Sequence, residues 1–170
     1  MRLSLSYSRS KQHGVATVEF ALIAIIFFTM LFAILEFGRM MYVFNSTQEV
    51  TRRGAREAVV RWIDQMDAVK TLALFGGTSL PAGAELAASN IKIEYLKKNG
   101  SVVTSFPVDP SDNLSACGDI TRADNCIFSV RVSIVNLTYK PMVSLFNFLS
   151  IALPSSSSTM HAESMGFETI

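Results

Sequence analysis

Glu19 has the most unusual surroundings of the charged residues in this sequence, because it lies inside a long apolar segment. Residues 15–35 read VATVEFALIAIIFFTMLFAIL and contain no other ionisable side chain. A carboxylate in lipid is costly unless it lies near the headgroups or has a partner. Taken alone, Glu19 fits two interpretations equally: an acid that reaches the headgroups from the start of a membrane helix, where the helix dipole favours it, or a functional group. Its position five residues after Gly14 bears on this choice.

Cys117 and Cys126 are a candidate disulfide pair. They are the two cysteines of the chain, they are flanked by turn residues, and no His or Cys cluster with zinc spacing accompanies them. We expect a disulfide that closes a short loop, stabilises it by about 2–3 kcal/mol in the chain-entropy model, and requires an oxidising compartment. The alternative is two unpaired thiols in a reducing compartment. The apolar N-terminal segment favours export, and therefore the disulfide.

The sequence contains no pattern that is typical of an enzyme. The histidines, His13 and His161, lie near opposite ends, and neither a G-x-S-x-G nor a Walker A motif occurs. The carboxylates are scattered, and no set of metal ligands is apparent. The net charge is +1, so no strong field favours nucleic acid. We therefore expect no catalytic residues, no metal, no cofactor and no nucleic-acid partner.

The apolar segment has the length of a membrane-spanning helix. Residues 15–35 span roughly 30 Å at about 1.5 Å per residue, which matches the hydrocarbon core of a bilayer. The segment is long for a secretory signal, and no A-x-A-type cleavage site follows it. Arg2, Arg9 and Lys11 precede it without an acid. We therefore expect a cytoplasmic N-terminus and a periplasmic C-terminal part.

Apolar residues continue at helical spacing beyond the predicted span. The spacing persists to Val69 and predicts that residues 36–70 extend the same helix outside the membrane, with one apolar face. No proline interrupts residues 15–80. Gly38 and Gly54 each weaken the helix by about 1 kcal/mol and permit bends or close packing. The whole helix would be roughly 80 Å long.

Residues 71–170 have the pattern of a small β-rich domain with a disulfide loop. We interpret residues 71–90 as a linker with a helical turn at 84–88. The alternation in residues 91–95 predicts a strand, and Asn99-Gly100 predicts a hairpin to residues 102–106. The cysteine-containing segment 107–126 is interpreted as a loop.

The strongest strand pattern in the chain lies near its C-terminal end. Residues 128–134 alternate strictly, and the phase slips after Ile134, which predicts a bulge or bend there. Pro141 ends this strand, and an apolar patch follows at residues 142–149. The serine run at residues 155–158 fits an edge strand or a flexible tail equally well. The fold class is therefore α+β: a long N-terminal helix whose outer part packs on a small antiparallel sheet, since each apolar face needs a cover.

The N-terminal motif resembles a type IV prepilin. Gly14, four mostly small or apolar residues and Glu19 in an apolar helix follow a short basic leader. In that family a membrane aspartic peptidase cuts after the glycine, and the acid is the fifth residue of the mature chain. The resemblance implies that residues 1–14 are removed and that Val15 gains a positively charged amine. Val15 and Glu19 share a helix face. In a staggered stack, Glu19 could therefore pair with the Val15 amine of a neighbouring subunit.

A narrower resemblance is to the TadE-like pseudopilins of the Tad (Flp) pilus system. The matching residues are Gly14, Val18-Glu19-Phe20-Ala21, Glu36-Phe37-Gly38-Arg39 and the segment TRRGAREA at 51–58. The match is specific over residues 14–60 and loose beyond, where a Tyr-Lys-Pro at 139–141 precedes the apolar patch. Major Flp pilins are much shorter, so a domain of this size points to a minor pilin. The sister protein TadF shares the N-terminal pattern, and Glu36-x-Gly38-Arg39 favours TadE.

The resemblance implies a structural role in a bacterial pilus that serves surface adherence. Its partners would be a prepilin peptidase, other minor and major Flp pilins, an inner-membrane assembly platform and the bilayer. Glu19 and Phe20 would serve subunit assembly. Glu36 and Arg39 would form either a surface ion pair of little energy or a docking site for the platform. The main alternative is a single-pass anchored periplasmic binding or scaffold domain, in which Gly14 is incidental and Glu19 merely interfacial. An anchored periplasmic enzyme is a third and weaker alternative.

Overall fold

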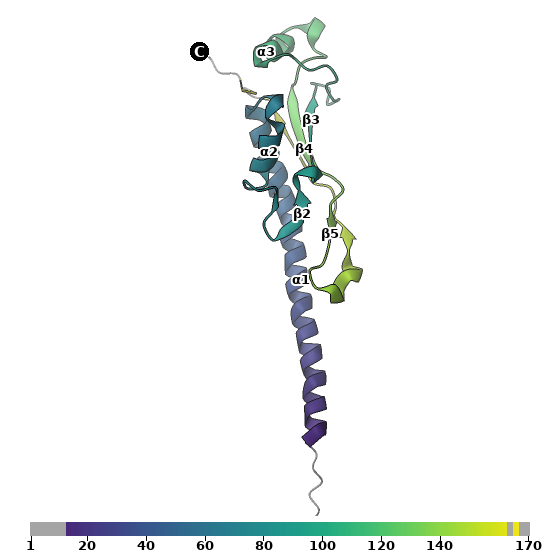
Figure 1. The fold of residues 1–170 in the computed structure, drawn as a ribbon. Helices are drawn as coiled ribbons and strands as arrows, with labels where there is room; N and C mark the ends of the chain where they lie inside the picture. The colour runs from purple at the N-terminus through teal and green to yellow at the C-terminus, as the bar shows by residue number, and fades with distance from the viewer. Residues whose placement is uncertain (1–12, 163–164, 167–170) are drawn as a thin grey trace, which may run out of the picture.

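A single long helix forms the axis of the molecule in the computed structural model, which describes residues 13–162 and 165–166 (Figure 1). This helix, α1 (His13–Val60), has 48 residues and is therefore about 70 Å long. The rest of the chain packs along its C-terminal half. By length and composition α1 can cross a membrane, and its most apolar stretch is not buried within the protein. Residues 1–12 of the predicted leader lie outside the described residues.

The helix does not continue to Val69, and this part of the sequence prediction is wrong. α1 ends at Val60, the backbone of Trp62 is extended, and the short 3-10 helix η1 (Ile63–Gln65) follows. The next helix, α2 (Met66–Ala73), packs on α1, and its Val69 and Ala73 are buried. The helical spacing was correctly detected, but it belongs to two helices. The reversal lets α2 add its apolar face to the same core. The N–H of Met165 donates to the Val59 carbonyl (3.0 Å), one of the carbonyls that the end of α1 leaves free.

Gly54 permits close packing where α1 meets the rest of the domain. A Cβ added to Gly54 would lie 3.1 Å from Cγ1 of Val132 and 3.3 Å from Cβ of Ala73. A Cβ added to Gly38 would meet nothing within 4 Å. Of Gly38 and Gly54, only Gly54 therefore has the packing role that the sequence suggested for either.

The main sheet has three antiparallel strands in the order β3-β4-β7. They are β3 (Ile91–Leu96), β4 (Ser129–Ile134) and β7 (Ser157–His161). Val132 of the central strand pairs with Ile93 on one side and Ser158 on the other. The alternation predicted for β4 is confirmed, since Val130, Val132 and Ile134 are buried. The second half of the serine run, Ser157 and Ser158, begins the edge strand β7, so the segment is not a flexible tail. These findings confirm the predicted α+β fold.

Two small two-stranded sheets lie beside the main one. β1 (Ser79–Leu80) pairs with β2 (Gly83–Ala87), so the helical turn expected at 84–88 is wrong. The tight turn at Ala82, with φ of 56°, brings β2 back onto β1, and Leu86 of β2 enters the core. β5 (Thr138–Tyr139) pairs with β6 (Ile151–Ala152). The bend predicted after Ile134 is present, because Asn136 adopts a φ of 54° between β4 and β5.

The remaining segments modify two further expectations. Gly100 makes the predicted turn with a φ of 83°. Residues 102–106, the expected second strand of the hairpin, form only a single bridge, between Val102 and Leu96. The segment 107–126 is not all loop, because it contains α3 (Pro110–Gly118). The Asp109 side chain caps this helix by accepting from the Asp112 N–H (2.7 Å), and proline suits its first turn. The other short helices are η2 (Ala88–Asn90), η3 (Ile120–Arg122) and η4 (Ser144–Leu149).

Candidate functional site

The residues predicted for processing and assembly lie in the first turns of α1. Gly14, Val15, Glu19 and Phe20 are all exposed, and Phe20 retains 72% of its surface. A Cβ added to Gly14 would meet nothing within 4 Å. Val15 and Glu19 are four residues apart in one uninterrupted helix, so they lie on the same face. The outer domain does not cover this end of α1 (Figure 1).

Glu36 marks the junction where the outer domain first covers α1. Its side chain is only 6% exposed, although it directly follows the apolar segment. The Tyr139 hydroxyl of β5 donates to Oε1 of Glu36. The backbone N–H groups of Met142 and Val143 donate to the same carboxylate at 3.0 and 3.4 Å. The carboxylate thus binds the segment after β5 to the helix.

Arg39, one turn further along α1, extends this junction to β2. Its guanidinium donates to the Lys140 carbonyl (3.1 Å) and forms an ion pair with Glu85 of β2. It also lies 3.6 Å from Oε1 of Glu36 and 4.9 Å from the centre of the Tyr139 ring. Arg39 therefore joins its own helix α1 to β2 and to the residues at the end of β5, Tyr139 and Lys140.

The electrostatics of the junction favour the protonation states that these hydrogen bonds require. Burial by itself raises the pKa of the Glu36 carboxyl, but hydrogen bonds from Tyr139, Met142 and Val143, with the charge of Arg39, outweigh it and lower the pKa overall. Burial, followed by the hydrogen bond to Glu36, raises the pKa of the Tyr139 hydroxyl. Glu36 is therefore an ionised acceptor, and Tyr139 remains a donor.

Glu36 and Arg39 are not the surface ion pair that was one of the two sequence interpretations. The partners of both side chains come from residues 85 and 139–143 of the same chain, far away in sequence. Sequence reasoning missed Tyr139 and Glu85 as these partners, although the Tyr-Lys-Pro before the apolar patch was a visible signal. The suggested contact of this pair with an assembly platform stays a prediction.

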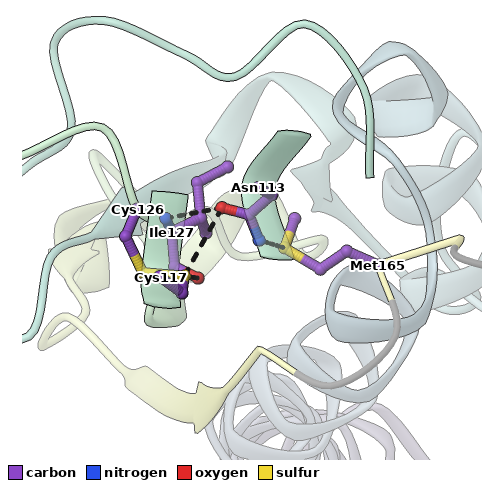
Figure 2. The surroundings of a disulfide bond; sticks show 5 residues. All are labelled: Asn113, Cys117, Cys126, Ile127 and Met165. Atoms are coloured by element: carbon purple, nitrogen blue, oxygen red, sulfur yellow. Dashed lines mark hydrogen bonds between the residues drawn. A yellow bond between two sulfur atoms is a disulfide. The ribbon is translucent and has the colours of Figure 1, made fainter. Parts of the chain in front are cut away.

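Cys117 and Cys126 form the predicted disulfide, which joins α3 to the segment before β4 (Figure 2). Asn113, one turn earlier in α3, is buried, and its Oδ1 accepts from the Ile127 N–H at 2.8 Å. Its amide nitrogen lies 3.9 Å from the sulfur of Met165. The disulfide region therefore also holds Met165, whose N–H binds the end of α1.

A polar groove of about 420 Å³ lies between α1 and the serine run. Phe44, Thr47 and Thr51 line it from the helix, and residues 154–158 line it from the other side. Oγ1 of Thr51 lies 3.2 Å from Oγ of Ser156 across it.

Among residues 13–162 and 165–166, no group of three or more His, Cys, Asp or Glu side chains is placed to hold a metal ion. His161 packs edge-on against the ring of Phe128.

Comparison with known proteins gives a result for the N-terminal helix alone. A family model described as TadE-like protein matches residues 14–56. No curated protein and no solved structure matches the chain. The matched residues include Gly14, Glu19 and the Glu36–Arg39 pair, and they end before the β-rich part begins. The match supports a component associated with a Tad pilus. Residues 14–56 of this chain are thus TadE-like, which confirms the resemblance seen in the sequence.

Proposed function

We propose that this chain is a TadE-like minor pilin, a structural component needed to assemble a Tad (Flp, type IVb) pilus that serves surface adherence. The observation that carries the proposal is the spacing of Gly14 and Glu19 at the start of a 48-residue helix. The first half of that helix exposes apolar side chains. A membrane aspartic prepilin peptidase cuts between Gly14 and Val15 and removes the leader.

The chain is held in the bacterial inner membrane by residues 15–35. The basic leader stays in the cytoplasm, and the domain from residue 36 onward lies in the periplasm. Two features support this location. Apart from Ala33, which borders a crevice of the outer domain, the side chains of residues 15–35 are largely exposed, so lipid is their natural cover. The Cys117–Cys126 disulfide suits an oxidising compartment.

Glu19 sets the register of the subunit in the pilus. An unpaired carboxylate is costly in an apolar bundle, and the nearest suitable cation is the N-terminal amine that cleavage creates on a neighbouring pilin. Phe20 lies beside it and has most of its surface free to pack on that neighbour. The other minor pilins, the major Flp pilin and an inner-membrane assembly platform are the proposed partners. The role is structural, and no catalysis is assigned to the chain.

The experiment that tests this role compares two exposed acids of α1, Glu19 and Glu49. The full chain carrying Glu19→Ala should be made, cleaved and inserted, but pilus assembly should be lost, because the amine of the neighbour has no partner. Glu49→Ala changes the same charge in the half of α1 that carries the outer domain and should leave assembly intact. Normal piliation with Glu19→Ala would refute the proposed role of Glu19.

The second candidate is a single-pass anchored periplasmic binding or scaffold domain. The groove between α1 and the serine run favours it, because Thr51 and Ser156 place hydroxyl groups in a concave surface. In that case Gly14 has no role, and Gly14→Leu should leave the function of the chain unchanged. The minor-pilin proposal requires instead that Gly14→Leu blocks cleavage and piliation.

A further inference from the structure

A lobe at the end of the outer domain exposes apolar side chains that the pilin proposal does not use. We call residues 141–152 the apolar lobe; it contains η4 and β6. Met142 is 75% exposed, Leu145 57% and Phe148 77%. Phe146 points into the protein and is buried, and the centres of the Phe146 and Phe148 rings are 6.4 Å apart. The lobe is therefore folded and anchored, while its outer face remains apolar.

The lobe lies at the level where α1 leaves the predicted membrane span. Glu36, the first residue after the span, accepts hydrogen bonds from the Met142 and Val143 N–H groups. Beside this contact, an apolar crevice of about 130 Å³ lies between the lobe and the helix. Ala33 lines the crevice from inside the span, opposite Leu149 and Ile151. In Figure 1 this segment, which follows β5, lies on the side of the outer domain toward the exposed half of α1.

We infer that the apolar lobe lies in the headgroup region of the same bilayer that α1 crosses, as a second membrane contact of the chain. This inference rests on the membrane anchoring in the proposed function. Its basis is continuity, because Leu149 and Ile151 of the lobe, which are 38% and 45% exposed, line the same crevice as Ala33 of the predicted span. Apolar side chains beside a basic residue are the chemistry of an interfacial segment, and Lys140 is exposed next to the lobe.

The hydrogen bonds of Glu36 and the contacts of Arg39 fix the lobe to the helix. Because these contacts join the lobe to α1, the two membrane contacts cannot move independently. The lobe thereby restricts the tilt and rotation of the outer domain on the membrane. This gives the buried junction a role that the sequence pattern alone does not suggest.

Fluorescent probes at three positions can test the inference on the full-length chain in phosphatidylethanolamine–phosphatidylglycerol vesicles. Both native cysteines are in the disulfide, so a single introduced cysteine can be labelled selectively with an environment-sensitive dye. The test position is Phe148→Cys. Ile26→Cys reports on the middle of the span. Ile120→Cys is the matched control, because Ile120 is 95% exposed but lies in η3, next in the chain to α3, at the end of the domain away from the membrane half of α1 (Figure 1).

The expected result is a blue-shifted emission for the probe at 148 and a loss of its fluorescence with lipids that carry a quencher near the headgroup. The probe at 26 should respond most to a quencher deep in the acyl chains. The probe at 120 should respond to neither. Water-like emission at 148, with a lipid response at 26, would overturn the lobe inference alone. A probe at 148 that is blue-shifted without lipid quenching would identify a protein cover and overturn it too. No lipid response at 26 would overturn both the inference and the membrane anchoring.

Discussion

The exposed half of α1, residues 15–35, and the part of the chain from Glu36 onward differ in what covers their apolar side chains. In the first region most side chains are apolar, and they are largely exposed in the described protein. In the second region α1 becomes one layer of a small core, with α2 and the three-stranded sheet against it. In the proposed pilin, lipid and other subunits cover the first region, whereas contacts within the chain cover the second. The TadE-like match, at residues 14–56, lies within α1 and covers the helix in both regions.

Because the two regions differ in cover, truncating a phenylalanine should affect stability far more in the second region than in the first. Phe146→Ala removes a buried ring and should lower the free energy of unfolding by about 3–5 kcal/mol. Phe20→Ala removes an exposed ring and should change it by less than about 0.5 kcal/mol. Denaturant titration of the full chain in detergent measures both, followed by the fluorescence of the one tryptophan, Trp62. Comparable losses for the two variants would contradict the division of the molecule.

Removing the disulfide should destabilise the outer region and leave the membrane half unaffected. Replacing Cys117 and Cys126 by serine should cost about 2–3 kcal/mol, because the bond closes a short loop and its loss frees the unfolded chain. Trp62 should also report the change, because the disulfide region holds Met165 at the end of α1. Membrane insertion should be unchanged in a flotation assay. Loss of insertion in the double variant would mean that the two regions are coupled.

The junction at Glu36 should make part of the stability depend on pH. Because the pKa of Glu36 is lowered by folding, its contribution is present above the ordinary carboxyl value of 4.5 and is lost as the pH falls through the lowered pKa. Glu36→Gln should cost about 1.5–3 kcal/mol at neutral pH, since charged hydrogen bonds are replaced by neutral ones.

Unfolding curves at several pH values check the contribution of Glu36. The wild-type chain should lose stability below pH 4.5 more steeply than Glu36→Gln. Tyr139→Phe removes the hydroxyl that donates to Oε1 and to the backbone carbonyl of Glu36 but keeps the charge of Glu36, so it serves as the intermediate case. Identical pH profiles for the wild type and Glu36→Gln would show that this carboxylate does not stabilise the junction.

Alanine at Gly38 and at Gly54 of α1 gives the smallest predicted effect. Gly54→Ala should destabilise the chain by about 1–3 kcal/mol, because the new Cβ would press on Val132 and Ala73. Gly38→Ala has open space and should be neutral or stabilising by up to about 1 kcal/mol, because alanine favours a helix. Thermal unfolding of the pair resolves this difference. A larger loss for Gly38→Ala than for Gly54→Ala would contradict the packing described here.

The division of the molecule also explains which features the sequence predicted. The exposed half of α1 and strand β4 depend on local periodicity, and both are visible in the apolar pattern alone. The reversal after Val60 was missed because no proline or glycine marks it. The reversal depends instead on tertiary contacts such as the hydrogen bond from the Met165 N–H to the Val59 carbonyl. The partners of Glu36 were missed for a similar reason, since they lie more than 100 residues away. Local patterns cannot show such pairings.

The N-terminal residue of the mature protein is the most direct test of the central claim, that Gly14 and Glu19 form a pilin processing and assembly motif. The chain should be purified from cells that contain the cognate prepilin peptidase, and its N-terminus should be sequenced. The mature chain should begin at Val15, which makes Glu19 its fifth residue. A chain that still begins at Met1 in the presence of an active peptidase would contradict it.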